Sequence, residues 1–499
     1  MNITKIFGPP GTGKTTTLLG EVEGALDSGI HPDRIGYLTF TKKAAAEGVE
    51  RACSKFNLLP QDLPYFRTIH SLMYQLLGLS RNQVMGIGNY KEFGEWLGVD
   101  ISGMTVDAED GLPMGGQEGD KCLRIHHLAR NRLVDLRSEW ERSGEDIDWL
   151  SVEQFARGYD QWRGNRNLLD FTDMLEQCPD TPKFELLIID EAQDLTPLQW
   201  KVARNLMSKA DRILLAGDDD QAIYNWAGAD ADLFIKAPGS IRVLEKSYRL
   251  PRAIWELSQG IVSGIHHRVA KDWAPRDEQG MVEQVESVEH LPLESGEWML
   301  LARNKFLLGH YTEHLKERGV LFSSKGSATS LSEDLARSII GWEQLRKGGR
   351  ISGDDACGIY GYMVAGTQYE RGNKARLSRL EQAPIDMAEL RDHFGLLEDR
   401  PWFEAMPRIG DGDREYIREA LRSGEKLLHP RIHVSTIHGV KGGECDNVVL
   451  LPDMAYRTHQ GYEEDPCSER RVFYVGATRA RHNLWNLSPI SNLGVDFIV

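Results

Sequence analysis

Short apolar runs alternate with helix-like segments in the first half of the chain. Residues 3–7, 35–40, 184–189 and 212–217 are apolar runs of strand length, and the alanine-rich stretch 43–53 has the composition of a helix. Strands that alternate with helices predict a parallel α/β sheet, because parallel strands need a crossover connection. Sheets of this kind bind ligands at the carboxyl ends of their strands.

A second set of strand patterns follows in the C-terminal half. The stretches 76–168 and 326–425 are instead polar, charged and helical, and the first contains a glycine-rich loop at 111–119. We therefore expect two α/β cores, each interrupted by one helical insertion. The patterns that predict the second core are strands at 241–245, 297–302, 432–436, 447–451 and 483–487 and a helix at 469–481.

Composition fits a globular protein of several domains. The 499 residues are 41% hydrophobic and 27% charged, and they include no apolar run long enough to predict a transmembrane helix. The N-terminus has no basic segment of the kind that begins a signal peptide. The six cysteines are scattered, with no C-x-x-C pair, which argues against a zinc or iron–sulfur site. These features predict a cytoplasmic protein without a membrane partner.

The net charge of −16 argues, by itself, against a nucleic-acid partner. Whole-chain charge is a weak guide, however, because a basic cleft can lie on an acidic body. Local basic groups occur at 42–43, 124–137, 374–379 and 470–481, although each is also typical of a solvated helix face.

The sequence around residue 8 predicts a phosphate-binding loop. Gly8-Pro9-Pro10-Gly11-Thr12-Gly13-Lys14-Thr15 follows an apolar strand and precedes a helical pattern, which is the context of a P-loop. The glycines let backbone N–H groups turn toward phosphate oxygens, and the helix N-terminus adds its positive dipole. We expect Lys14 to reach the β- and γ-phosphates and the Thr15 hydroxyl to bind Mg²⁺. The chain is therefore expected to be a nucleoside triphosphatase.

Two acidic residues follow the predicted strand at 184–189. Asp190 and Glu191 would lie at the carboxyl end of that strand, where Asp190 could bind Mg²⁺ and Glu191 could act as the general base for an attacking water. An ordinary acidic loop after a core strand is the alternative, and the P-loop upstream favours the catalytic reading.

Further motifs occur in a fixed order along nearly the whole chain. Asp190-Glu191-Ala192-Gln193-Asp194 is followed by the run 217–226, which reads Gly-Asp-Asp-Asp-Gln-Ala-Ile-Tyr-Asn-Trp. These two segments resemble motifs II and III of superfamily-one DNA helicases of the UvrD/Rep type. The other segments that resemble motifs of that family are 39–45, 68–71, 169–173, 248–249, 434–444 and 469–480.

The resemblance implies a fold as well as a function. It implies an α/β protein with two RecA-like parallel-sheet motor domains, each with a mainly helical inserted subdomain. The boundaries we expect are 1–75 and 169–240 for the first motor domain, 76–168 for its insertion, 241–325 and 426–499 for the second motor domain, and 326–425 for its insertion.

The resemblance also implies roles for single residues. Gln221 would contact the γ-phosphate, and Arg249 and Arg479, from the second core, would act as arginine fingers at an ATP cleft between the cores. Tyr248 would stack on the adenine and Glu444 would reach the ribose. The implied nucleotide contacts of the loop are Gly8, Pro9, Pro10, Gly11, Thr12, Gly13, Lys14, Thr15 and Thr16. The implied DNA contacts are Phe40, Thr41, Thr68, His70, Tyr224, Trp226, Thr436 and His438.

The function implied by the resemblance is that of an ATP- and Mg²⁺-dependent DNA helicase that moves 3′ to 5′ on single-stranded DNA. Its expected partners are single-stranded DNA and tailed duplex DNA, and we expect a monomer in isolation. The alternatives are a translocase that strips proteins from DNA, a nucleotide-dependent switch that does not track on DNA, and a motor directed to RNA. Because the P-loop begins at Gly8, the glutamine motif that precedes it in the family has no counterpart, and we expect lax nucleotide selectivity.

Overall fold

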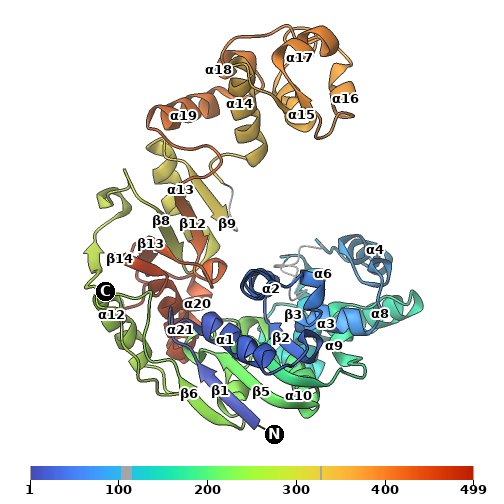
Figure 1. Cartoon of the computed structure of the whole chain (residues 1–499), viewed down its shortest axis with the longest axis vertical. Coiled ribbons are helices and arrows are strands. Elements are labelled where there is room, and N and C mark those ends of the chain that lie inside the picture. The colour runs from blue at the N-terminus through green and yellow to red at the C-terminus, as the bar shows by residue number, and fades with distance from the viewer. Residues whose placement is uncertain (1, 103–114, 326–328, 498–499) are drawn as a thin grey trace. The chain divides into compact units, whose positions relative to one another are not determined.

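The computed structural model describes residues 2–102, 115–325 and 329–497 of the chain (Figure 1). These residues form two compact units, each built around its own sheet. Unit 1 comprises Met1–Arg252, Val262–Glu278 and Pro466–Tyr474, and unit 2 comprises Ala253–Ile261, Gln279–Asp465 and Val475–Val499. Among the described helices, none combines the length and apolarity needed to cross a bilayer.

Unit 1 contains a six-stranded sheet in which every neighbouring pair is parallel. The predicted strands are present at the expected positions, and the alanine-rich helix is present as α2 (Lys42–Phe56). In sheet order the strands are β3 (Phe66–Thr68), β2 (Ile35–Thr39), β4 (Phe184–Ile189), β5 (Ala210–Gly217), β1 (Asn2–Phe7) and β6 (Ser240–Val243).

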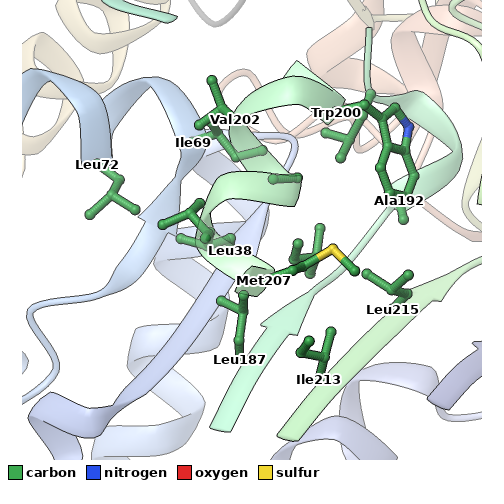
Figure 2. Packing of buried hydrophobic residues seen from close by; sticks show 14 of the residues in the cluster. Leu38, Ile69, Leu72, Leu187, Ala192, Trp200, Val202, Met207, Ile213 and Leu215 are labelled. Carbon is green, nitrogen blue, oxygen red and sulfur yellow. The ribbon is translucent and has the colours of Figure 1, made fainter. Parts of the chain in front are cut away.

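Helices cover both faces of this sheet. Successive residues of a strand point to opposite faces, so each strand contributes side chains to two apolar clusters. Leu186 and Ile188 of β4 pack in one apolar cluster with residues of α1 (Lys14–Asp27) and α2. Leu187 and Ile189 pack in the opposite cluster, part of which is drawn in Figure 2. The helices that contribute to that second cluster are α3 (Ile69–Leu76), α9 (Phe171–Glu176), α10 (Pro197–Ser208) and α11 (Ala231–Ile235).

The helical insertion of unit 1 has an aromatic core of its own. Phe93, Phe155, Tyr159 and Trp162 are its buried centre. Its helices are α4 (Ile87–Leu97), α6 (Glu118–Arg132), α7 (Leu136–Ser143) and α8 (Trp149–Asn165). Within the predicted glycine-rich loop at 111–119, residues 111–114 lie outside the described part of the chain.

The strand predicted at 241–245 does not begin the second core, and this prediction was wrong. The strand that forms there, β6, pairs in parallel with β1 at the edge of the first sheet. Leu244 then donates its backbone N–H to the carbonyl of Phe7 at 2.9 Å. The apolar pattern indicated a strand correctly but carried no information about which sheet it would join.

Unit 2 has a second six-stranded parallel sheet. The sequence missed its two edge strands, β7 and β9, because polar residues interrupt both segments and leave no continuous apolar run. In sheet order the strands are β7 (Met281–Val285), β14 (Ala480–Leu487), β13 (Cys445–Leu451), β8 (Trp298–Ala302), β12 (Ile432–Thr436) and β9 (Phe322–Lys325). The predicted α/β fold with two parallel sheets is thus confirmed.

Helices of unit 2 lie beside this sheet and in a separate helical insertion. Trp342, Tyr360 and Trp402 are buried in the core of that insertion, which also contains a short antiparallel pair of strands. The remaining elements are α12 (Arg252–Ser263), α13 (Leu308–Glu317), α14 (Glu333–Arg346), β10 (Ile351–Ser352), α15 (Gly353–Tyr362), α16 (Asn373–Leu377), β11 (Pro384–Ile385), α17 (Met387–Phe394), α18 (Trp402–Ala405), α19 (Asp411–Arg422), α20 (Tyr456–Glu464) and α21 (Pro466–Ala477). Of these, α12 and α21 each contribute residues to both units.

Candidate active site

The predicted phosphate loop connects β1 to α1 in unit 1. Gly11 and Gly13 have φ values of 71° and 76°, in the left-handed region that glycine adopts at no steric cost. Gly8 donates its N–H to the carbonyl of Gly217 at 3.0 Å, which fixes the loop to the end of the neighbouring strand β5. Thr15 and Thr16 lie in the first turn of α1. The loop therefore has the backbone conformation and the helix N-terminus that phosphate binding requires.

Lys14 lies directly against the two acidic residues after β4. Its Nζ is 2.9 Å from Asp190 Oδ1 and 2.5 Å from Glu191 Oε1. Burial alone would lower the pKa of Lys14, but the two carboxylates outweigh it and raise that pKa. Tyr37 of β2 donates its hydroxyl to Asp190 Oδ2 at 3.2 Å. The structure therefore places a cation, two carboxylates and a phosphate loop together at the carboxyl ends of the strands of this sheet.

Glu191 adopts an uncommon backbone conformation. Its φ of 54° is in the left-handed region, which costs a residue with a Cβ roughly 1–2 kcal/mol. Two hydrogen bonds hold it there, from Glu191 N to Asp190 Oδ1 at 2.8 Å and from Asp194 N to the Glu191 carbonyl at 3.0 Å. Backbone strain of this kind clusters at functional sites.

Gln193 links the acidic pair to the neighbouring strand end. Its fully buried side chain donates to Glu191 Oε2 at 2.6 Å and accepts from the backbone N–H of Asp218 at 3.1 Å. A Cβ on Gly217 would clash with the Gln193 side-chain oxygen, so the bridge needs glycine at the end of β5. The residue lies inside a motif that the sequence singled out, but its bridging role was missed.

Gln221 lies one turn beyond Asp218, in the short 3-10 helix η5 (Asp219–Gln221). Its side-chain Nε2 donates to Asp218 Oδ2 at 2.8 Å. Glu191, Gln193, Asp218 and Gln221 thus form one continuous hydrogen-bonded path across the ends of β4 and β5.

Residues 247–249 pack onto the phosphate loop. The buried Ser247 hydroxyl donates to the Pro10 carbonyl at 2.7 Å, and Tyr248 donates its N–H to the Gly11 carbonyl at 2.8 Å. A Cβ on Gly11 would clash with Arg249, and the Tyr248 ring, 72% exposed, lies beside Gly13. Arg249, which the sequence assigned to the second core, therefore belongs to unit 1, because β6 pairs with β1.

Three candidate DNA-contacting aromatics of unit 1 adjoin one another, although Phe40 is far in the sequence from Tyr224 and Trp226. The ring centroids of Phe40 and Tyr224 are 5.3 Å apart, and those of Tyr224 and Trp226 are 6.4 Å apart. Phe40 is buried at 7% exposure, whereas Trp226 is 37% exposed. Arg132 of α6 donates to the Asn225 carbonyl at 2.9 Å, so the helical insertion supports the loop that carries Trp226.

The other candidate DNA contacts of unit 1 also have structural roles. The hydroxyls of Thr41 and Thr68 accept from Ala44 N at 3.1 Å and Ser71 N at 3.2 Å, and so cap α2 and α3. Burial and the nearby Lys42 lower the pKa of His70 to about 4, so this buried imidazole is neutral at pH 7. The ring of His70 meets that of Phe171 edge-on at 5.8 Å.

The remaining candidates lie in unit 2. Thr436 ends β12 and accepts from Gly439 N at 3.2 Å, and His438 begins the 3-10 helix η9 (His438–Val440). Arg479 is buried and donates to the carbonyls of Val475 at 2.8 Å and Gly443 at 3.1 Å. Glu444 lies 3.6 Å from Arg481, next to the start of β13.

Lys271 is a further charged residue of the site, and no pattern in the sequence predicted it. Its side chain is 1% exposed and lies 3.1 Å from Asp218, 2.5 Å from Asp219 and 2.7 Å from Asp220. Those carboxylates are about fifty residues upstream, so only the tertiary structure brings the groups together.

Comparison with known proteins supports the assignment of both units. The model of the UvrD/REP helicase N-terminal domain matches residues 2–241, and that of the UvrD-like helicase C-terminal domain matches residues 431–486.

Several curated proteins are similar to this chain. The putative ATP-dependent DNA helicase YjcD of Bacillus subtilis is 27% identical over 300 residues, which are 54% of this chain and 38% of the relative. The ATP-dependent DNA helicase PcrA of Staphylococcus aureus is 25% identical over 286 residues, 53% of this chain and 38% of the relative. A probable DNA helicase II homolog of Rickettsia felis is 27% identical over 297 residues, 54% of this chain and 43% of the relative. The chain thus matches less than half the length of these relatives.

Both family models match in the expected order, and they cover the segments that carry the phosphate loop, the acidic pair and Arg479. The chain belongs to the UvrD/Rep family of superfamily-one helicases.

Proposed function

We propose that this protein is an ATP-dependent DNA helicase that moves 3′ to 5′ along single-stranded DNA and separates duplex DNA. The observation that carries the proposal is the contact of Lys14, at the end of the phosphate loop, with Asp190 and Glu191. A cation, a Mg²⁺-binding carboxylate and a general base next to a phosphate loop are the groups that hydrolysis of a nucleoside triphosphate needs. The names of the similar proteins support DNA as the substrate of the motor.

The proposed hydrolysis uses residues of unit 1 in distinct roles. Lys14 binds the β- and γ-phosphates, Glu191 takes the proton of the attacking water, and Gln221 contacts the γ-phosphate. The Thr15 hydroxyl and the Asp190 carboxylate fit Mg²⁺, which prefers oxygen ligands and keeps several waters. The ion would screen the phosphate charge when bound. Lys14 must leave part of its present contact with the acids to reach a phosphate, so nucleotide binding frees Glu191 to act as a base.

Four further residues complete the proposed nucleotide site. Arg249 and Arg479 stabilise the charge on the transferred phosphoryl group, Tyr248 stacks on the base, and Glu444 contacts the ribose. Arg479 now donates to two backbone carbonyls of unit 2 and would exchange those bonds for phosphate contacts.

DNA binding is proposed for the exposed Trp226 with Phe40 and Tyr224, together with Thr41, Thr68, His70, Thr436 and His438. Aromatic stacking holds single-stranded bases without regard to their sequence, as a motor requires. Direction of travel and a monomeric state stay predictions from the family resemblance, and a cytoplasmic location stays a prediction from the composition and the cysteine pattern.

A strand-displacement assay tests this proposal. The purified protein, with Mg²⁺ and ATP, is given duplexes that carry a 3′ tail, a 5′ tail or no tail. We expect displacement of the 3′-tailed duplex at least about tenfold faster than of the other two. ATP hydrolysis on single-stranded DNA without displacement of any duplex would instead indicate a translocase, and preference for the 5′ tail would reverse the proposed direction.

A further inference from the structure

A cluster of buried charges lies behind Gln221, and the hydrolysis scheme does not use it. Asp218, Asp219 and Asp220 are each at most 1% exposed, and all three contact Lys271. Arg268 makes two hydrogen bonds to Asp220, at 2.8 and 2.5 Å. Buried carboxylates are costly unless they are paired, and here Lys271 and Arg268 supply the pairing charges.

Within the cluster, Asp218 is the carboxylate that the described hydrogen bonds join to the Gln221 side chain. Its Oδ1 receives Lys271 Nζ at 3.1 Å and the backbone N–H of Asp220 at 3.2 Å, while its Oδ2 receives Gln221 Nε2 at 2.8 Å. Its own N–H donates to Gln193. The two carboxylate oxygens are therefore committed to different donors, one on the anchoring side and one on the side of Gln221.

This arrangement determines which way the Gln221 amide points. An ionised carboxylate only accepts hydrogen bonds, so Gln221 must present its NH₂ group to Asp218. On balance the pKa of Asp218 is raised above its usual range, chiefly by burial and also by the neighbouring Asp219 and Asp220. Lys271 and the hydrogen bond from Gln221 oppose this rise, and so both favour the ionised form that can act only as an acceptor.

We propose that Asp218, anchored by Lys271, is a positioning residue that fixes the amide orientation of Gln221, so that its NH₂ group is held by the protein and its carbonyl oxygen is presented to the nucleotide site. The inference rests on the proposed placement of Gln221 at the γ-phosphate, and it makes that contact one through the attacking water. A carbonyl oxygen accepts a hydrogen bond from that water while Glu191 takes its proton, whereas an NH₂ group would donate to a phosphate oxygen, so the two orientations do different chemistry.

Two isosteric substitutions separate this role from simple support of the fold. In Asp218→Asn, the remaining side-chain oxygen continues to accept from Lys271 Nζ and from the backbone N–H of Asp220. The new NH₂ group then faces Gln221. Two NH₂ groups cannot bond, so the Gln221 amide must rotate. Asp220→Asn is the matched control, because it removes one buried charge that contacts Lys271 and Arg268 but accepts nothing from Gln221 in the bonds described.

The first readout is ATP hydrolysis on single-stranded DNA. We expect Asp218→Asn to lower kcat at least about tenfold, with KM for ATP within about threefold, and Asp220→Asn to lower kcat less than about threefold. In a Gln221→Ala background, Asp218→Asn should change kcat less than about twofold, because a residue that acts only through Gln221 has nothing left to position. Lys271→Gln should lower kcat by the same route and add little to Asp218→Asn.

The second readout needs no hydrolysis and so separates this inference from the proposed function. In protein labelled with ¹⁵N-glutamine, the Gln221 side-chain amide is assigned by its loss in Gln221→Ala. We expect its protons to exchange with water at least about tenfold faster in Asp218→Asn than in the parent, and within about threefold of the parent in Asp220→Asn. The inference is overturned if the Gln221 amide protons exchange at the same rate in Asp218→Asn and Asp220→Asn, or if the two variants lose kcat equally. It is also overturned if their losses of kcat follow their melting temperatures, or if Asp218→Asn lowers kcat by the same factor in the Gln221→Ala background as in the parent.

Discussion

The two units contain the same kind of sheet but place their candidate residues differently. In unit 1 the phosphate loop follows β1, the acidic pair follows β4 and Asp218 follows β5, and these three strands are neighbours in the sheet. The candidate DNA contacts Phe40 and His70 follow β2 and β3. All strands of unit 1 are parallel, so every one of these groups lies at the same edge of the sheet.

In unit 2 the candidates are divided between opposite edges. Thr436 and His438 lie at the carboxyl end of β12, whereas Glu444 and Arg479 immediately precede β13 and β14. Since these strands are parallel, the two groups are separated by the length of a strand, about 16–23 Å for five to seven residues. The proposed nucleotide and DNA contacts are therefore close neighbours in unit 1 and well separated in unit 2. Substitutions should therefore affect both activities together in unit 1 and separately in unit 2.

The largest expected effect is at the shared edge of unit 1. Lys14→Ala should lower kcat for ATP hydrolysis on the order of 10³-fold or more, because it removes the phosphate-binding cation. It also leaves Asp190 and Glu191 without the cation that now contacts both. Steady-state ATP hydrolysis measures the loss. Lys55→Ala, which removes an exposed lysine paired with Glu23, is the control. Equal rates in the two variants would contradict the proposed site.

Arg479→Ala should have the next largest effect. We expect kcat to fall about 10³-fold, as for other arginine fingers, both with and without DNA. The dissociation constant for single-stranded DNA should change less than about threefold, because the DNA candidates of unit 2 lie at the opposite edge. Arg318→Ala is the control, since this exposed arginine of unit 2 pairs with Glu294 at 2.7 Å, away from the proposed nucleotide contacts. Loss of DNA binding in Arg479→Ala would contradict the proposed separation of nucleotide and DNA contacts in unit 2.

Trp226→Ala should weaken DNA binding about tenfold, since stacking contributes about 1–3 kcal/mol per base. Fluorescence anisotropy with a labelled single strand measures the dissociation constant. Trp96→Ala is a matched control, because Trp96 is a tryptophan of unit 1 with 54% exposure that lies in α4, away from the strand ends. Equal increases of the dissociation constant in the two variants would contradict a specific role of Trp226 in DNA binding.

The smallest expected effect is a pH dependence of stability in unit 1. The pKa of His70 is about 4 in the fold, below the unfolded value of about 6.5, so the unfolded chain binds the extra proton first. Its contribution to stability is therefore fully present above pH 6.5 and is lost as the pH falls toward 4, by about 2 kcal/mol between pH 7 and pH 5. Hydrogen exchange of α3 measures this loss, which should be absent in His70→Gln. An equal loss of stability between pH 7 and pH 5 in the parent and in His70→Gln would rule out His70 as the source of the pH dependence.

Much of this architecture follows from the sequence, and the exceptions have physical causes. Apolar runs predicted β4 and β5 because both strands are buried on two faces. They misplaced β6, since a run of apolar residues does not specify its partner strand. The approach of Lys14 to Asp190 was predictable, because all strands of one parallel sheet place their carboxyl ends on the same side, although β5 lies between β1 and β4.

The supporting residues were not predictable in the same way. Gln193 bridges two strand ends, and Lys271 neutralises carboxylates far away in the sequence. Neither role depends on a local pattern, because both arise from packing between segments that only the folded chain brings together.

We propose that one side of the unit 1 sheet serves both nucleotide and DNA. The most direct test is the rate of ATP hydrolysis by the intact protein with and without a saturating single-stranded oligonucleotide. We expect the rate to rise at least about tenfold with DNA. A rate that is the same in the presence and absence of DNA, at concentrations where the oligonucleotide is bound, would contradict it.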